Sequence, residues 1–189
     1  MTVIFLTHAQ VHIDPSVPVP DWGLTAEGQA RHAAFARAPE LEGLAAVFAS
    51  GERKALDGAA PAAARAGLRL RQRTALGEND RSATGYLPPD RFERMADRFF
   101  AEPDMSVEGW ERARDAQIRI VGAVRAALAE DRADGPVLIV AHGAVGALLR
   151  CHLKGRTITR DEDQPATGGG NWFAFDPAMD GPPTDWRTI

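Results

Sequence analysis

The chain has 189 residues, of which 44% are hydrophobic and 25% are charged, a composition typical of a folded globular protein and unlike a disordered or fibrous one. The net charge of -4 gives no broad positive field that would attract nucleic acid or an anionic membrane. We therefore expect a single domain over residues 1–189, without a nucleic-acid or membrane partner. The lone cysteine, Cys151, excludes an intrachain disulfide and a cysteine-based zinc site, and a cytoplasmic protein is the simplest expectation.

The first element is a short apolar run over residues 3–6, rich in β-branched and aromatic side chains, which predicts a strand buried on both faces of a parallel sheet. His8 follows the end of that strand. Three prolines within residues 14–20 exclude a helix and predict an extended loop. Thr25 is then placed to cap a helix whose body covers residues 29–37.

A second buried strand is expected over residues 44–49, and Ser50 is placed to cap a helix that runs to about residue 66. Alternating leucine and arginine over residues 68–74 predicts a half-exposed strand near a sheet edge. The polar segment 77–89 reads as a long loop that covers a neighbouring surface. A helix over residues 91–101 follows it.

In the last third of the chain, Ser106 is expected to cap a long core-facing helix that ends at about Asp131. Residues 136–141 form the clearest buried strand, and His142 and Gly143 follow it directly, before a helix over residues 144–153. A final strand is expected over residues 171–175, and the chain from residue 177 onward is expected to wrap the surface.

Strands that alternate with helices predict a three-layer α/β sandwich, with a mostly parallel central sheet and helices on both faces. In such open sheets, ligands bind beyond the C-terminal ends of the strands. His8 and His142 both follow strand ends, so we expect their imidazoles to converge over one edge of the sheet.

Two converging histidines suit phosphoryl transfer, because one can attack phosphorus while the other helps to hold the charged oxygens. The phosphoryl group also needs fixed donors, from Arg, Lys or the N–H groups at a helix N-terminus. The leaving oxygen needs a proton, which a carboxylic acid can supply. The sequence contains candidates for each of these roles.

Five segments, taken in order, resemble the motifs of the histidine phosphatase (phosphoglycerate mutase-like) superfamily. They are residues 5–10 (FLTHAQ), 24–30 (LTAEGQA), 49–55 (ASGERKA), 76–78 (LGE) and 140–145 (VAHGAV). The resemblance implies that His8 accepts the phosphoryl group, that His142 is the second pocket histidine, that Glu78 donates the proton, and that Gly143 lies at the phosphate. It also implies that neither a metal nor an organic cofactor takes part.

The sequence departs from the family pattern at two arginines that bind phosphate. Thr7 stands where the family has arginine directly before the nucleophilic histidine, and one lost charge-assisted bond weakens transition-state binding by about 1.5–3 kcal/mol. The second arginine aligns with Lys54, although Arg53 is one position away, and one helical position turns a side chain by about 100 degrees. Arg81, in the loop after Glu78, is a candidate to compensate.

These residues predict a phosphatase that hydrolyses a small phosphomonoester through a phosphohistidine on His8, in preference to a mutase. The alternatives are a non-catalytic or weakly active binder of a phosphorylated ligand, and a phosphohistidine-protein phosphatase. Asp80 is the second choice as proton donor, and His12 is a poor zinc ligand without further ligands. The substrate and the oligomeric state stay open.

Overall fold

The computed structural model describes residues 1–130 and 134–189. Its centre is a six-stranded sheet in the order β3-β2-β4-β1-β5-β6. The four strands β3, β2, β4 and β1 are parallel, and β5 and β6 are antiparallel to their neighbours. The strands are β1 (Val3–Thr7), β2 (Ala46–Ala49), β3 (Leu70–Gln72), β4 (Val137–Ala141), β5 (Asn171–Phe175) and β6 (Arg187–Thr188).

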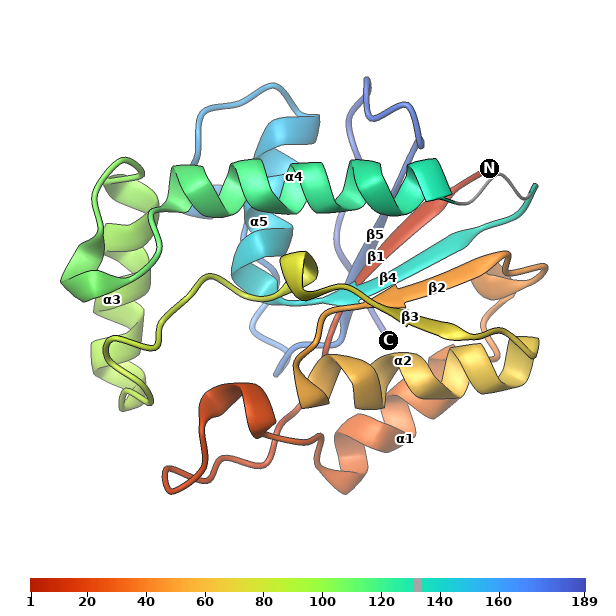
Figure 1. Cartoon of the computed structure of the whole chain (residues 1–189), viewed down its shortest axis with the longest axis horizontal. Coiled ribbons are helices and arrows are strands. Elements are labelled where there is room, and N and C mark those ends of the chain that lie inside the picture. Colours follow the sequence, from red (N-terminus) through yellow and green to blue (C-terminus); the bar gives the residue numbers. More distant parts are fainter. Residues whose placement is uncertain (131–133) are drawn as a thin grey trace.

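Helices cover both faces of this sheet, as Figure 1 shows, with α4 and α5 on one side and α1 and α2 on the other. The helices are α1 (Ala26–Phe35), α2 (Arg53–Ala66), α3 (Pro89–Ala101), α4 (Ala113–Glu130) and α5 (Gly143–Leu153). No helix in the described part of the chain is long and apolar enough to cross a membrane. The predicted three-layer α/β sandwich with a mostly parallel sheet is confirmed.

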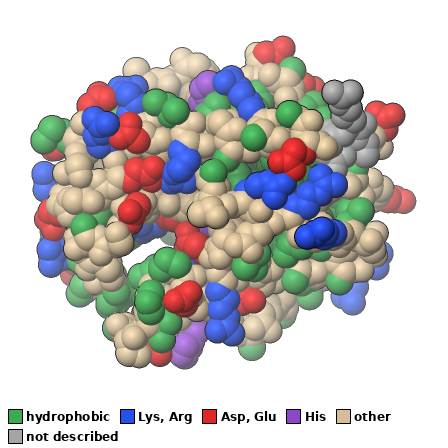
Figure 2. Space-filling model, in the orientation of Figure 1, with side chains coloured by type: hydrophobic (Ala, Val, Ile, Leu, Met, Phe, Trp, Pro, Cys, Tyr) green, Lys and Arg blue, Asp and Glu red, His purple; other side chains and the backbone are tan. Residues whose placement is uncertain are grey.

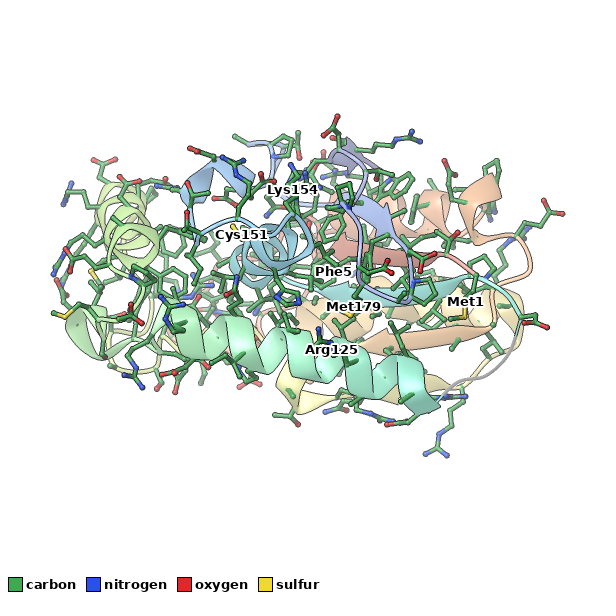
Figure 3. All side chains as sticks on the ribbon, turned by 90° about the horizontal axis from the view of Figure 1, so that it is seen from above. Met1, Phe5, Arg125, Cys151, Lys154 and Met179 are labelled. Atoms are coloured by element: carbon green, nitrogen blue, oxygen red, sulfur yellow. The ribbon has the colours of Figure 1, made fainter. Side chains whose placement is uncertain are left out.

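Two apolar clusters fill the space between the layers, one on each face of the sheet. The β1 side chains divide between them, because alternate residues of a strand point to opposite faces: Val3 and Phe5 join the α4–α5 side, and Ile4 and Leu6 the α1–α2 side. Phe5 and Met179, both in the first cluster, lie beside α4 and α5 in the view of Figure 3. All five β1 residues are buried, as the continuous apolar run predicts.

Two of the predicted helix caps are wrong. Ser50 does not cap α2, which begins at Arg53 with Glu52 as the capping residue, because the Ser50 hydroxyl contacts His142 instead. Ser106 does not begin α4. Its hydroxyl donates to the Trp110 carbonyl and closes a short turn, and the helix α4 starts only at Ala113. The expected end of this helix, Asp131, lies outside the described residues.

The expectation for the C-terminal tail also needs correction. Residues after 177 do cross the surface, but Arg187–Thr188 forms the edge strand β6, which pairs with Trp172 and Asn171 of β5. Thr25, by contrast, caps α1 as predicted, because its hydroxyl accepts from the N–H of Gly28 at 3.1 Å. The edge position of β3 is likewise confirmed.

Strand register brings three chain segments together at one edge of the sheet. The last pairs are Thr7 with Ala141 and Ala49 with Val140, so β1, β4 and β2 end side by side. The residues that follow them, His8, His142 and Ser50, therefore start their turns at neighbouring points. This is the edge at which ligands bind in open α/β sheets.

Candidate active site

His8 and His142 meet as predicted, with their ring centroids 5.2 Å apart and their planes inclined at 64°. His142 is fully buried, whereas His8 is half-buried. Burial favours the uncharged form of an imidazole. Burial, reinforced by the neighbouring His142, lowers the pKa of His8 to about 3, and burial also lowers the pKa of His142 although Glu52 opposes it. Both rings are therefore neutral at physiological pH.

The protonation of the His8 ring follows from a single contact. Its Nδ1 lies 2.9 Å from the backbone carbonyl oxygen of Ala9, and a carbonyl can only accept, so Nδ1 carries the proton. In a neutral ring the other nitrogen, Nε2, then keeps its lone pair. The fold thus holds His8 in the tautomer that a nucleophilic imidazole needs.

A carboxylate that the sequence did not predict lies next to the histidines. Glu52 Oε1 is 3.2 Å from His142 Nε2, and Glu52 Oε2 is 2.5 Å from Lys54 Nζ. Burial opposes the charge on Glu52, but His142 and Lys54 outweigh it and lower its pKa to about 2. Glu52 is therefore ionised and serves as the counter-ion of Lys54, which is itself buried and also donates to the Val19 carbonyl.

Ser50 links the end of β2 to His142. Its hydroxyl lies 2.6 Å from His142 Nε2 and accepts from the N–H of Glu52. His142 Nδ1, in contrast, is buried and has no hydrogen-bond partner among the residues that the structure describes. Ser50 and Glu52 together fix the orientation of the His142 ring through Nε2.

Glu78 is held at the N-terminus of α5. Its two carboxylate oxygens accept from the backbone N–H groups of Ala144 and Val145, at 3.2 and 3.1 Å. The N-terminus of a helix stabilises negative charge, both through its free N–H groups and through its dipole. The Glu78 N–H donates to Glu52 Oε1 at 2.9 Å, so the two carboxylates share one pocket.

The three basic candidates take different positions. Arg81 pairs with Glu78 Oε2 at 3.1 Å, and its guanidinium lies over the rings of Phe92 and Trp110. Lys54 is inside the pocket, as described above. Arg53 points away from it: its side chain is 68% exposed and pairs loosely with Asp57 at 3.8 Å.

Thr7 is fully buried and faces a residue from the distant loop before β5. Its hydroxyl donates to Gln164 Oε1 at 2.7 Å and accepts from the N–H of Asn171 at 3.0 Å. Gln164 Nε2 lies against Gly143, so closely that a Cβ on Gly143 would collide with it. Gln164 therefore spans the neighbours of both histidines, Thr7 on one side and Gly143 on the other.

Two loops form the rim above these residues. The loop after β1 and the loop over residues 77–88 touch through Trp22 and Tyr86, whose ring centroids are 5.7 Å apart. Figure 2 shows that the molecule is hollowed between the loop after β1 and the α3 side, with hydrophobic side chains gathered along one border of the hollow. A covering role was predicted for residues 77–89 alone, and it stays a prediction.

Comparisons with known proteins identify the family of this chain. The sequence profile of the histidine phosphatase superfamily (branch 1) matches residues 3–169. The chain belongs to this superfamily. A mycobacterial glucosyl-3-phosphoglycerate phosphatase, solved with inorganic phosphate, is 22% identical with a TM-score of 0.76, covering 100% of this chain and 95% of that one.

YhfR from Bacillus stearothermophilus is 22% identical with a TM-score of 0.78, covering 93% of this chain and 90% of its own chain. At such identities the likeness shows the fold alone. No curated protein matches the sequence significantly. The profile match over residues 3–169 confirms the superfamily assignment made from the five motif segments.

Two of the sequence-based alternatives lie outside the candidate site. Asp80 is exposed, and its carboxylate accepts from the N–H of Ser82 instead of facing the histidines. His12 is also exposed. Within residues 1–130 and 134–189, no group of three or more His, Cys, Asp or Glu side chains could hold a metal ion.

Sequence reasoning missed four residues that shape the site. Ser50, Glu52, Gln164 and His32 stand outside the motif positions that carry chemistry. His32, on α1, is buried and its Nε2 accepts from the N–H of Ala9 at 3.1 Å. Ser50 and Glu52 had a signal in the sequence, since both lie in the motif segment 49–55 beside Lys54.

Proposed function

We propose that this member of the histidine phosphatase superfamily is a phosphatase that hydrolyses a small phosphomonoester through a phosphohistidine on His8. The observation that carries the proposal is the tautomer of His8: the protonated Nδ1 donates a hydrogen bond to the Ala9 carbonyl, which leaves the lone pair of Nε2 free. The low pKa of this ring, about 3, keeps that lone pair available at physiological pH.

In the first step, His8 Nε2 forms a bond to phosphorus while the bond from phosphorus to the ester oxygen breaks. Glu78 gives its proton to the leaving alkoxide, so an alcohol departs. In the second step, water attacks phosphorus, the bond between phosphorus and nitrogen breaks, and Glu78 accepts the proton of the water. The products are one alcohol and one inorganic phosphate, and Glu78 ends protonated as it began.

The first step requires a proton on Glu78 when substrate is bound. A protonated Glu78 would also release one of its oxygens from the N–H groups of Ala144 and Val145, which could then face the phosphoryl oxygens. His142, Lys54, Arg81 and Gly143 supply the remaining contacts in this proposal.

A trapping experiment tests the proposal. The protein is incubated with a radiolabelled phosphomonoester, quenched, and examined for label that is acid-labile and alkali-stable. We expect label in the wild type and none in His8→Ala, while His12→Ala, which alters an exposed histidine of the same loop, keeps it. Glu78→Gln is expected to slow release of the alcohol by about 10²–10⁴-fold.

One observation favours a second candidate, a phosphate-binding member without catalysis. The buried Lys54 is already paired with Glu52, and Thr7 replaces an arginine of the family motif. If the wild type binds inorganic phosphate but shows neither label nor turnover over a broad panel of phosphomonoesters, the phosphatase proposal is wrong and this candidate replaces it.

A further inference from the structure

The orientation of the Gln164 amide is fixed by a chain of hydrogen bonds. Asn171 Nδ2 lies 3.3 Å from the Pro165 carbonyl, which can only accept, so this atom of Asn171 is the amide nitrogen. The same Nδ2 donates to Gln164 Oε1 at 3.1 Å, and the Thr7 hydroxyl donates to that oxygen at 2.7 Å. The oxygen of Gln164 thus faces Thr7 and Asn171, and its amide nitrogen points the other way.

The amide nitrogen of Gln164 lies beside the turn from β4 into α5. It is packed against Gly143, the residue that follows His142 and opens α5. Neither of its two N–H groups has an acceptor in the described part of the chain. A donor pair without a protein acceptor, beside the second histidine, is the kind of group that binds a phosphoryl oxygen.

The loop that carries Gln164 is tied to the main chain of the nucleophile. Gly170 donates its N–H to the His8 carbonyl at 2.9 Å. Gly169 has a positive φ of 79°, and a Cβ there would collide with the same carbonyl. The close approach requires glycine, and it anchors the loop that carries Gln164 to the main chain of His8.

We infer that Gln164 Nε2 binds a non-bridging oxygen of the phosphoryl group, in place of the guanidinium that the family motif puts at position 7. The inference rests on the proposed function and names a further phosphate-binding residue for the same site. Thr7 becomes a positioning residue, because its hydroxyl holds the Gln164 oxygen. A neutral amide takes the role of a cation in a pocket that already contains the charges of Lys54 and Arg81.

The test measures binding of inorganic phosphate by calorimetry, together with kcat and KM for a phosphomonoester. Gln164→Ala removes the donor, and we expect the Kd for phosphate to rise about tenfold, the equivalent of about 1.4 kcal/mol. Gln164→Glu keeps an oxygen for Thr7 and Asn171 but replaces the nitrogen with a second oxygen. We expect it to keep a Tm close to that of the wild type while phosphate binding falls more than tenfold.

Gln117→Ala is the matched control, since it truncates a half-buried glutamine of α4 whose amide nitrogen donates to the Leu148 carbonyl, and it should leave phosphate binding unchanged. In Thr7→Arg with Gln164→Ala, the long side chain at position 7 enters the space that Gln164 leaves, and phosphate binding should return. The double variant thus asks whether the two groups serve the same oxygen.

The outcomes separate this inference from the proposed function. If the wild type turns over phosphomonoesters and both Gln164 variants bind phosphate like the wild type, the inference is wrong and the phosphatase proposal stands. If the wild type binds phosphate without turnover and the variants bind it more weakly, the inference stands and the phosphatase proposal fails. A Tm loss in both Gln164 variants with unchanged phosphate binding would assign Gln164 a purely structural role.

Discussion

Glu52→Gln should make the protein less stable and, at the same time, a better phosphate binder. The Glu52 carboxylate lies 2.5 Å from Lys54 Nζ, and the side chains are 16% and 5% exposed. Removing one partner of a buried ion pair typically costs about 3–5 kcal/mol, because the other charge stays buried and unpaired. Since Glu52 keeps some contact with solvent, we expect the free energy of unfolding to fall by about 2–4 kcal/mol.

The same substitution changes the charge that a phosphate meets. Glutamine leaves Lys54 Nζ without its anionic partner, so the pocket gains one net positive charge. Two unit charges about 5 Å apart interact by about 3 kcal/mol at an effective dielectric constant of 20. Allowing for screening, we expect the Kd for inorganic phosphate to fall by about tenfold, equivalent to about 1.4 kcal/mol.

Urea unfolding and phosphate calorimetry on the same preparations measure the two effects. Glu102→Gln is the matched control, because Glu102 pairs with Arg98 at 3.8 Å on the exposed face of α3; it should change the free energy of unfolding by less than about 0.5 kcal/mol. If Glu52→Gln unfolds like the wild type and binds phosphate no better, then Glu52 is not the counter-ion that holds Lys54.

Four further outcomes follow from the structure. Because the pKa of His8 is lowered to about 3, imidazole nitrogen NMR should show Nδ1 protonated and Nε2 unprotonated from pH 8 down to about 4.5. The loss of the signal in His8→Ala assigns it. A titration of this signal near pH 6.5 would contradict the lowered pKa of His8. In the unfolded chain His8 has its ordinary pKa of 6.5 and becomes protonated below it, while the folded protein keeps the ring neutral down to about pH 3. His8 should therefore lower the free energy of unfolding as the pH falls from 6.5 towards 3. His8→Ala should flatten this part of the curve of unfolding free energy against pH. Gly58→Ala should destabilise the protein by about 1–3 kcal/mol in thermal unfolding, because the new Cβ would lie 2.7 Å from the His32 ring. In a helix interior, alanine is normally more stabilising than glycine by about 0.5–1 kcal/mol. A higher Tm would show that His32 moves aside freely. Arg119→Met should lower the free energy of unfolding by about 2–4 kcal/mol and make the backbone at Glu78 more mobile, since Arg119 donates to the carbonyls of Ala75, Gly77 and Glu78. Unchanged hydrogen exchange in residues 75–79 would show that Arg119 does not hold this segment.

The sequence alone predicted the fold and the two histidines for a local reason. A continuous apolar run identifies a buried parallel strand, and the residue after such a strand lies at the ligand-binding edge of the sheet. The runs that end before His8 and His142 therefore located both rings, and the motif spacing added Glu78 and Lys54. Single-domain organisation and a cytoplasmic location remain predictions.

The tertiary structure decided which charges face the histidines, because those contacts join segments far apart in the chain. Helical phase alone could not choose between Arg53 and Lys54, and packing of α2 against the sheet buried Lys54 and left Arg53 in solvent. Ser50 was predicted as a helix cap, yet its hydroxyl found a partner 92 residues away in His142. Thr7 is a further example. The sequence shows that threonine replaces the arginine of the family motif, but only the fold shows that Gln164, 157 residues further along the chain, contacts the Thr7 hydroxyl.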